Sequence, residues 1–255
     1  MSDPFLSIVT VCYNAQEVIV PTLESIRSQT VCNFEYIVVD GSSTDDTLKI
    51  LEKYEGIINV LISEPDLGIY DAMNKGQRLA KGKFIWFINA GDSIPSPDAT
   101  GLIEAFGTEH IDVIYGDAML VNKERVKIGL RSVVSAQKLP KHIELKDMNM
   151  GMVVCHQSVL ARTKLVEPYI LNNLSADIDW LIRILKKTNR TLNTQMILAD
   201  YLVDGLSKQR WYQSLKDRFS ILVNHFGLVP TIFNHFKIVF RALKHKWSRR
   251  GQSHY

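Results

Sequence analysis

Short apolar segments alternate with helical patterns along the first ninety residues. The segments LSIVTVC (6–12), FEYIVVD (34–40), residues 57–63 and KFIWFIN (83–89) have the length and composition of buried strands. Three helical patterns lie between these segments. They cover residues 17–29, the stretch that ends at Tyr54 and begins with a cap at Ser43 or Thr44, and residues 69–80. This alternation predicts an α/β fold, with a doubly wound, mostly parallel sheet and helices on both faces.

Polar residues follow these strands in three short stretches, 10–14, 40–43 and 89–92. Ligands of doubly wound sheets bind beyond the carboxyl ends of the strands, so these stretches mark the expected site. Neither a Gly-x-Gly-x-x-Gly fingerprint nor a phosphate loop ending in Gly-Lys-Ser/Thr is present in the sequence. The stretches are rich in Asp, and carboxylates hold a diphosphate through a divalent cation or contact the ribose and base instead.

The second half of the chain is less regular. Residues 112–120 and 125–130 suggest a strand pair, residues 131–150 suggest a loop, and Ser175 opens a helix. We expect one domain over residues 1–204, with two halves at 1–95 and 96–204. A tail follows it over residues 205–255.

The formal net charge of +3 hides an asymmetry between body and tail. Residues 205–255 contain ten Lys or Arg and one acidic residue, Asp217, which leaves 20 basic and 26 acidic residues in 1–204. Opposite net charges on the two parts indicate that the basic tail meets an anionic partner.

The tail from Pro230 onward has the pattern of a basic amphipathic helix. Apolar residues recur every three or four positions at Phe233, Phe236, Phe240, Leu243 and Trp247, with Lys237, Arg241, Lys244, Lys246, Arg249 and Arg250 between them. This pattern is typical of helices that lie in a membrane interface, so residues 230–250 predict contact with a membrane surface. The alternative is that the aromatic residues pack on the body. No RNA- or DNA-binding module is visible in the sequence, so nucleic acid is not an expected partner.

Cysteine usage and hydropathy indicate the compartment. Three cysteines, Cys12, Cys32 and Cys155, form no Cys-x-x-Cys pair, which disfavours a disulfide framework and fits a reducing cytoplasm. No apolar stretch reaches the ~18 residues of a membrane span, and the N-terminus lacks the features of a signal peptide. We expect a cytoplasmic protein that is peripheral at the inner face of the cell membrane.

Six stretches occur together in an order that is specific to one family. They are SIVTVCYNA (7–15), EYIVVDGSSTDDT (35–47), SEPDLGIYDAMNKG (63–76), AKGKFIWFINAGD (80–92), HQSVLAR (156–162) and SADIDWLIR (175–183). In these stretches the chain resembles the family 2 glycosyltransferases of the GT-A fold. It is similar to bacterial sugar transferases of colanic-acid and other exopolysaccharide pathways.

The resemblance implies transfer of a sugar, with inversion at the anomeric carbon, from a nucleotide-sugar to an acceptor hydroxyl. The donor would be a UDP-sugar by default, and the acceptor a glycan or a polyprenyl-diphosphate-linked sugar of cell-surface polysaccharide synthesis. The implied cofactor is a divalent cation, Mg²⁺ or Mn²⁺. Residues 1–95 would bind the nucleotide-sugar and residues 96–204 the acceptor.

Carried over residue by residue, the resemblance implies a catalytic base at Asp177 and a metal ligand at Asp92. The implied nucleotide-sugar contacts are Thr10, Tyr13, Asn14, Asp40, Ser42, Asp66, Tyr70, Asp71, Asn74 and Asn89. A further group would approach the diphosphate or the acceptor, namely His156, Gln157, Ser207, Lys208 and Arg210.

Two positions depart from the family pattern. The metal motif, residues 89–92, has one carboxylate where the family often has two or three, and Ala176 stands where an acidic residue usually precedes the base. A thin metal motif also fits a catalytically degenerate nucleotide-sugar-binding or membrane-scaffolding protein. A sugar nucleotidyltransferase is another alternative, although residues 13–16 lack its Gly-rich, Arg-containing loop.

Several of the implied site residues have plain structural alternatives. Asp177 precedes an apolar helix and could be its N-cap. Asp66 could be an ordinary turn residue, and His156 a buried, hydrogen-bonded histidine. Asp179 suits the dipole of the same helix as Asp177 and is expected to be structural.

Overall fold

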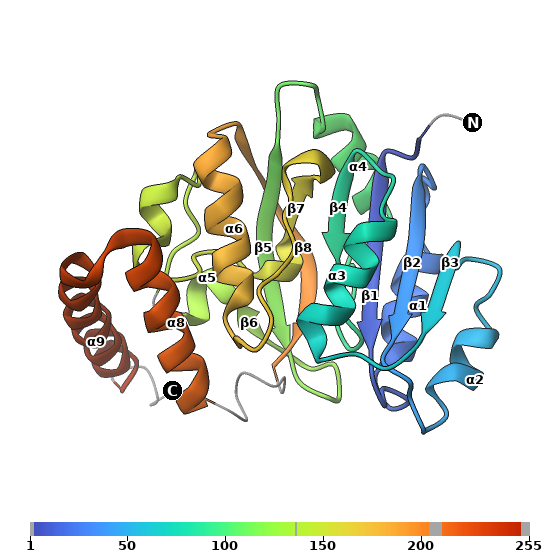
Figure 1. The fold of residues 1–255 in the computed structure, drawn as a ribbon, viewed down its shortest axis with the longest axis horizontal. Coiled ribbons are helices and arrows are strands. Elements are labelled where there is room, and N and C mark those ends of the chain that lie inside the picture. The colour runs from blue at the N-terminus through green and yellow to red at the C-terminus, as the bar shows by residue number, and fades with distance from the viewer. Residues whose placement is uncertain (1–2, 136, 204–210, 251–255) are drawn as a thin grey trace.

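The computed structural model describes residues 3–135, 137–203 and 211–250, and a sheet runs through the body of the chain (Figure 1). The strands are β1 (Leu6–Cys12), β2 (Phe34–Asp40), β3 (Val60–Ser63), β4 (Phe84–Phe87), β5 (Val113–Val121), β6 (Lys127–Leu130), β7 (Val159–Arg162) and β8 (Thr191–Leu202). Among the described residues, eight strands join in the order β3-β2-β1-β4-β7-β5-β6, and β8 pairs with β5. The α/β class and the mostly parallel sheet are confirmed.

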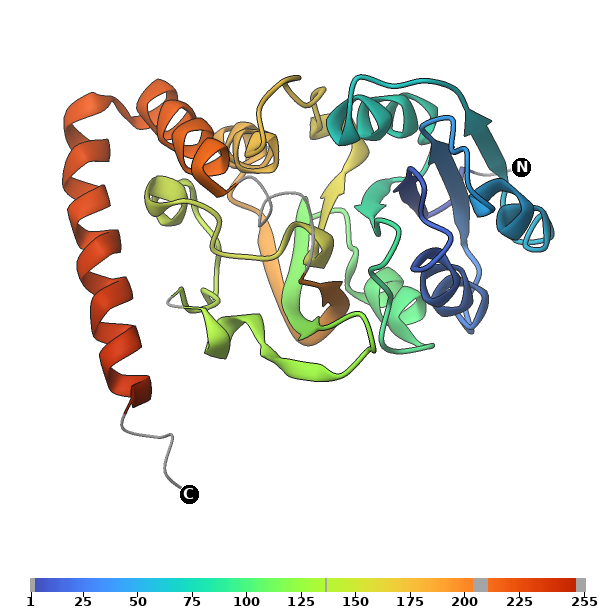
Figure 2. The same cartoon turned by 90° about the horizontal axis from the view of Figure 1, so that it is seen from below.

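Helices cover both faces of this sheet (Figures 1 and 2). The helices of the body are α1 (Ile19–Arg27), α2 (Thr47–Glu52), α3 (Ile69–Leu79), α4 (Ala99–Phe106), α5 (Arg131–Val134) and α6 (Ala176–Lys187), with the 3₁₀ turns η1 (Leu145–Met150), η2 (His156–Ser158) and η3 (Thr163–Leu165). Helices α3 and α6 lie on one face, and α1 and α4 lie on the other. Each face therefore has its own apolar core.

Strands β1 to β4 run parallel, so the loops that follow them lie at one edge of the sheet. The register pairs Cys12 with Asp40 and Asp40 with Ser63, which makes the ends of β1, β2 and β3 level. We call this side of the sheet the carboxyl edge. It is the side where ligands of such sheets bind.

The second half of the sheet is where the structure adds most to the sequence-based expectation. The strand pair is confirmed, since β5 and β6 pair antiparallel. Strand β7 lies antiparallel between β4 and β5, and β8 runs parallel to β5; neither strand is expected from the sequence. The expected loop 131–150 contains α5 and η1.

The expected start of the second helix was wrong. We predicted a cap at Ser43 or Thr44 and a helix through Tyr54, whereas α2 begins at Thr47 and its N-cap position is Asp46. The Ser43 hydroxyl is instead hydrogen-bonded to the carboxylate that ends β2, and it is therefore not free to cap a helix.

The tail forms two helices, α8 (Trp211–Phe226) and α9 (Leu228–Arg250), beside α6 and η1 (Figure 2). Helix α9 is attached through one face: Thr231 is fully buried, Asn234 donates to Asn149 O at 3.3 Å, and the His235 ring lies 4.9 Å from that of Phe219. Within the described part of the chain, no helix is long and apolar enough to cross a membrane.

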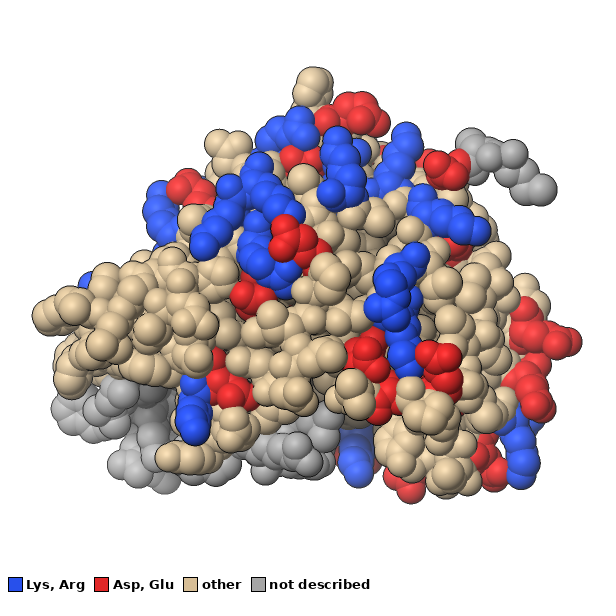
Figure 3. Space-filling view, in the orientation of Figure 1, with Lys and Arg blue, Asp and Glu red and all other residues tan. Residues whose placement is uncertain are grey.

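The opposite face of α9 is apolar and open to solvent. Phe233, Phe236 and Phe240 are 64%, 71% and 72% exposed, and Figure 3 shows few charged side chains over the part of this helix that is not drawn in grey. For these three residues the alternative of packing on the body is wrong. The side chains of Leu243 and Trp247 lie outside the described residues.

Candidate active site

The loops after β1 and β2 are tied together at the carboxyl edge. The backbone N–H of Asn14 donates to Ser43 Oγ, and Asn14 Oδ1 accepts the N–H of Thr44, both at 2.8 Å. Asn14 and Ser42 have left-handed backbone conformations, with φ of 47° and 61°. Residues other than glycine hold such conformations mainly where surrounding contacts fix them, and these positions cluster at ligand sites. Both belong to the predicted nucleotide-sugar contacts.

Asp40 and Thr10 lie beneath these loops rather than on their surface. Asp40 accepts hydrogen bonds from Ser43 N at 2.9 Å and Ser63 Oγ at 2.7 Å, and the Thr10 hydroxyl donates to Ile88 O at 2.6 Å. Both residues are fully buried. Their polar atoms are therefore used within the protein, and the structure gives them supporting positions instead of the direct nucleotide contact that we expected.

Tyr13 and Asp66 lie on two sides of Gly41. A Cβ atom at Gly41 would lie 2.4 Å from Asp66 Oδ2 and 3.4 Å from Tyr13 Cδ2, so a larger residue would displace the Asp66 carboxylate. Asp66 Oδ1 accepts the N–H of Gly68 at 2.8 Å, which is the contact of an ordinary turn. Its Oδ2 lies toward Gly41, beside the exposed Tyr13 ring. An aromatic ring and a carboxylate oxygen in this arrangement can stack on a base and accept its N–H.

Two predicted residues of α3 are occupied by contacts within the protein. Asn74 exchanges two hydrogen bonds with the backbone of Tyr169: it donates to Tyr169 O at 2.9 Å and accepts from Tyr169 N at 2.7 Å. Asp71 accepts the N–H of Leu67 at 3.0 Å. The geometry supports positioning of Tyr169 by Asn74.

Asp177 lies in the first turn of α6 and is partly exposed. The N-cap position is Ser175, so the capping alternative for Asp177 is wrong. The Tyr70 hydroxyl lies 3.4 Å from Asp177 Oδ1 and 3.3 Å from Leu174 O. Burial raises the pKa of Asp177 to about 6, and the hydrogen bonds from Ile178 N and Tyr70 oppose that shift. A carboxyl group with this pKa can accept a proton near neutral pH.

Asp92 lies in the turn after β4 and is almost fully buried. Its Oδ1 accepts the N–H of Leu202, at the end of β8, at 2.9 Å. Burial raises the pKa of Asp92 to about 7, whereas Leu202 N–H, the Arg125 charge and the Gln157 side chain lower it. A cation that binds beside this buried carboxylate therefore stabilises its charged form.

Cys155 connects the two carboxyl groups in space. Its thiol is buried, and burial raises its pKa to about 12; the negative charges of Asp92 and Asp177 both add to the shift. One thiol therefore experiences the charges of both carboxylates, although Asp92 follows β4 and Asp177 belongs to α6. The predicted base and the predicted metal ligand thus share an electrostatic neighbour.

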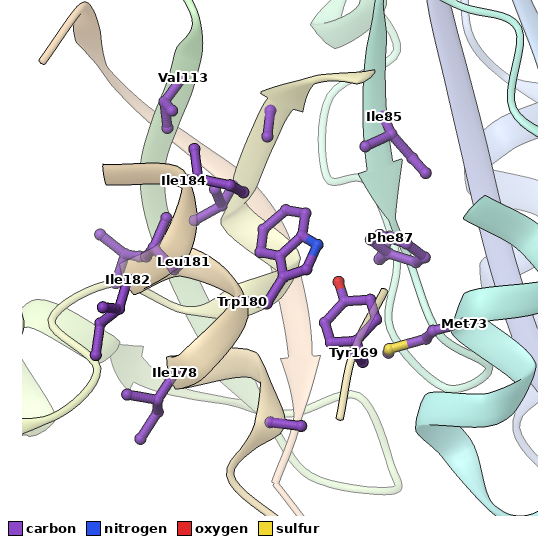
Figure 4. Packing of buried hydrophobic residues seen from close by; sticks show 14 of the residues in the cluster. Met73, Ile85, Phe87, Val113, Tyr169, Ile178, Trp180, Leu181, Ile182 and Ile184 are labelled. Carbon is purple, nitrogen blue, oxygen red and sulfur yellow. The ribbon is translucent and has the colours of Figure 1, made fainter. Parts of the chain in front are cut away.

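His156 lies in a cluster of aromatic rings beneath this region. Its Nε2 is 2.8 Å from the Tyr169 hydroxyl, and the Tyr169 and Trp180 rings stack with centroids 5.4 Å apart (Figure 4). Burial lowers the pKa of His156 to about 4, so the ring is neutral at pH 7. This environment is that of the buried, hydrogen-bonded alternative, with Phe87 packed against the same rings.

The residues at the Asp92 turn fit a hard divalent cation only in part. Asn89 Oδ1 is buried without a hydrogen-bond partner, and with the Asp92 carboxylate it supplies the oxygen donors that Mg²⁺ and Mn²⁺ prefer. Over the described residues, no group of three or more His, Cys, Asp or Glu could hold a metal ion. A cation here would therefore also need the phosphates of a substrate, as magnesium commonly does.

Two arginines near this region were not predicted. Arg131 donates to Met152 O at 2.7 Å and to Val153 O at 2.9 Å, and its charge lowers the pKa of Asp177. Arg125 reaches from the β5–β6 turn to Gly91 O at 2.6 Å. Single arginines outside the family motifs carry no sequence signal that distinguishes them from surface charges. The predicted Ser207, Lys208 and Arg210 lie outside the described residues.

The order of the strands and the helices on both faces of the sheet are those of the GT-A fold, which solved glycosyltransferase structures share. The model of the glycosyl transferase family 2 matches residues 7–167, and the chain belongs to this family. Both the enzyme class and the fold expected from the six motifs are thereby confirmed.

Known relatives support the assignment. The PGL/p-HBAD biosynthesis glycosyltransferase of Mycobacterium tuberculosis is 32% identical over 192 residues, which are 72% of this chain and 70% of the relative. Escherichia coli WfgD, a UDP-Glc:α-D-GlcNAc-diphosphoundecaprenol β-1,3-glucosyltransferase, is 28% identical over 226 residues and 87% of each chain. The mannosyltransferase PcManGT of Pyrobaculum calidifontis, solved with GDP-Man and Mn²⁺, has a TM-score of 0.67 at 14% identity over 100% of this chain and 77% of its own.

Proposed function

We propose that the protein transfers a sugar from a nucleotide-sugar, a UDP-sugar by default, to a hydroxyl of a glycan or polyprenyl-diphosphate-linked acceptor. The reaction inverts the anomeric carbon and serves the synthesis of cell-surface polysaccharide. The UDP-Glc donor and the lipid-linked acceptor of WfgD support this choice of substrates. The transfer takes place at the cytoplasmic face of the cell membrane.

The observation that carries the proposal is the position of Asp177. The residue lies in the same region as Asp92, at the carboxyl edge, and its raised pKa suits proton transfer near neutral pH. As the acceptor hydroxyl attacks, it becomes acidic, and Asp177 accepts its proton. Direct displacement needs only this one carboxylate on the attacking side, unlike the paired carboxyls of retaining hydrolases.

On the nucleotide side, Tyr13, Ser42 and Asp66 hold the base and ribose beside Gly41. Asp92 and Asn89 would hold the divalent cation, Mg²⁺ or Mn²⁺, and the Mn²⁺ in the PcManGT structure supports this cofactor. Such a cation would neutralise charge on the departing diphosphate. Tyr70 keeps its proton, because burial raises its pKa well above 10, and it therefore orients Asp177 as a hydrogen-bond donor.

A donor panel tests the proposal and separates it from the alternatives. The full chain is incubated with UDP-, GDP- and dTDP-sugars and Mn²⁺ or Mg²⁺, and nucleotide release is measured with and without glycan acceptors. Release that depends on the cation and rises with an acceptor supports the transferase. UDP binding without any release supports a degenerate binding or scaffolding protein, and formation of nucleotide-sugar from sugar phosphate supports a nucleotidyltransferase.

We expect Asp92→Ala to weaken UDP binding in the presence of Mn²⁺ by about tenfold, because the cation loses its carboxylate ligand. Asp92→Asn is the matched variant, since it keeps an oxygen that can accept the Leu202 N–H but carries no charge. Calorimetry with and without Mn²⁺ gives the affinities. If Asp92→Asn binds UDP and Mn²⁺ as the wild type does, Asp92 only anchors the turn.

With saturating Mn²⁺, which keeps Asp92 charged, we expect kcat/KM to rise with pH through about 6 and to level off above it, because Asp177 accepts a proton only in its charged form. At pH 5 the rate should be about tenfold below the plateau. Tyr70→Phe removes a hydrogen bond that lowers the pKa of Asp177, so its profile should shift to higher pH. Nucleotide release between pH 5 and 8.5 measures both; a flat wild-type profile would argue against Asp177 as the base.

A further inference from the structure

Arg218 lies on α8, where this helix meets η1, and among the described residues it is a cation without a partner. Its Nε is buried without a hydrogen bond, and no carboxylate in the described part of the chain pairs with the guanidinium. Burial alone lowers its pKa. The residue as a whole is partly exposed, so a ligand from solvent can reach it.

A buried guanidinium nitrogen without a hydrogen-bond partner costs free energy, and proteins normally pair such groups. The local backbone admits the side chain through Gly151, which has φ of 97° and no Cβ; a Cβ there would lie 3.2 Å from Arg218 Cδ. The guanidinium thus lies along η1 with hydrogen-bond donors unused. These properties fit an anion that binds from outside.

Two chains of contacts connect Arg218 with the surroundings of Asp177. The residues after Gly151 provide the carbonyl groups that bind Arg131, whose charge acts on Asp177. In addition, Asp217, the neighbour of Arg218, accepts the N–H of Leu174 at 2.8 Å. The carbonyl oxygen of Leu174 accepts a hydrogen bond from the Tyr70 hydroxyl, which also contacts Asp177.

The position also separates Arg218 from the expected donor diphosphate. The donor groups belong to the loops after β1, β2 and β4, whereas Arg218 belongs to α8, which packs against α9 and η1. Helix α9, which carries the exposed phenylalanines, packs against α8. A lipid-carried acceptor that reaches Asp177 from the side of α9 would bring its phosphates near Arg218.

We propose that Arg218 binds a phosphate group of the acceptor, a lipid-linked sugar diphosphate. The planar guanidinium matches two phosphate oxygens at once, which a lysine cannot do. The inference rests on the proposed glycosyltransferase function and adds the part of the acceptor that this chain recognises. Arg218 is then a binding residue for the acceptor and takes no part in proton transfer.

The test uses the full chain and inorganic pyrophosphate as the probe, in metal-free buffer, where the cation-dependent donor site does not hold a diphosphate; UDP is then added as a competitor. We expect Arg218→Gln to weaken pyrophosphate binding at least about tenfold, as for the loss of a charge-assisted hydrogen bond. Lys216→Gln, an exposed position on the same helix, should change nothing. Equal pyrophosphate affinity in Arg218→Gln, or displacement of pyrophosphate by UDP, overturns the proposal. Affinity for UDP itself is measured separately, so a failure of the proposed function is recognised on its own.

A melting experiment separates an effect of Arg218 on anion binding from an effect on the stability of the fold. Arg218→Met replaces the unpaired cation with an apolar chain of similar length, so its Tm should equal or exceed that of the wild type. Pyrophosphate should raise the Tm of the wild type and leave that of Arg218→Met unchanged. A lower Tm for Arg218→Met together with no effect of pyrophosphate on the wild type shows a packing role and overturns the proposal.

A flotation experiment distinguishes an acceptor phosphate from a lipid headgroup. Wild type and Arg218→Gln should float equally with vesicles of phosphatidylglycerol, because headgroups would meet α9 rather than the side chain beside Gly151. If Arg218→Gln loses flotation while its pyrophosphate affinity is unchanged, the arginine binds headgroups and the assignment to the acceptor is overturned.

Discussion

Asp177→Asn is expected to reduce sugar transfer by ~10²–10⁴-fold while UDP affinity stays within about twofold of the wild type. The amide keeps the size of the side chain and can still accept the Tyr70 hydroxyl, but it cannot take the proton of the acceptor hydroxyl. The nucleotide contacts lie on the loops after β1 to β4, so donor binding does not depend on this charge. Nucleotide release with an acceptor gives the rate, and calorimetry with UDP gives the affinity.

Asp179→Asn is the matched control, because this residue lies two positions further along α6. Asp179 binds Arg183 and His225 at 2.8 and 2.7 Å, so its charge joins α6 to α8 as the expected structural role requires. The control should lower the Tm and leave the rate within about threefold. Turnover by Asp177→Asn at the wild-type rate, with the control unchanged, would exclude Asp177 as the base.

The first half of the fold could be predicted because its strands are buried on both faces. Parallel strands covered by helices have continuous apolar sequences, and β1 and β2 begin and end where the sequence indicates. Strand β7 has only four residues and ends in Arg162, whose charge is paired with Asp112 at 3.0 Å. A run so short, ending in a cation, gives no periodic signal. Its pairing with β4 and β5 depends on tertiary contacts that the sequence does not display.

The sequence predicts which residues belong to the candidate site better than it predicts which atoms those residues contact. The family motifs identify Asp92 and Asp177, and the structure brings both to the region of Cys155. They do not indicate that Thr10 and Asp40 face the interior, because a polar residue at a strand end looks the same whether it binds a ligand or supports a loop. The sequence also does not indicate whether an arginine in a helix has a partner in the fold. Among the described residues, Nε of Arg218 has none.

The second large effect concerns the apolar face of α9. We expect the triple substitution Phe233→Ser, Phe236→Ser and Phe240→Ser to weaken binding to anionic vesicles by ~10²–10³-fold. Full burial of one Phe side chain contributes about 1.5–3 kcal/mol, and partial insertion of three rings at an interface would together contribute about half of that sum. These rings are exposed, and α9 is attached through Thr231, Asn234 and His235, so the Tm should not change.

Flotation with vesicles that contain phosphatidylglycerol measures the effect, and Lys237→Gln on the same helix measures how much of it is charge. One basic residue near an anionic surface contributes about 1 kcal/mol, so this single variant should lose only about fivefold. The chain from Arg218 to Tyr255 contains no Asp or Glu, so nothing acidic in this segment opposes an anionic surface. An unchanged flotation of the triple variant would exclude a membrane role for this face. If the triple variant instead converts a dimer to a monomer in size-exclusion chromatography, the phenylalanines cover a second copy of the chain, and lipid is not their partner.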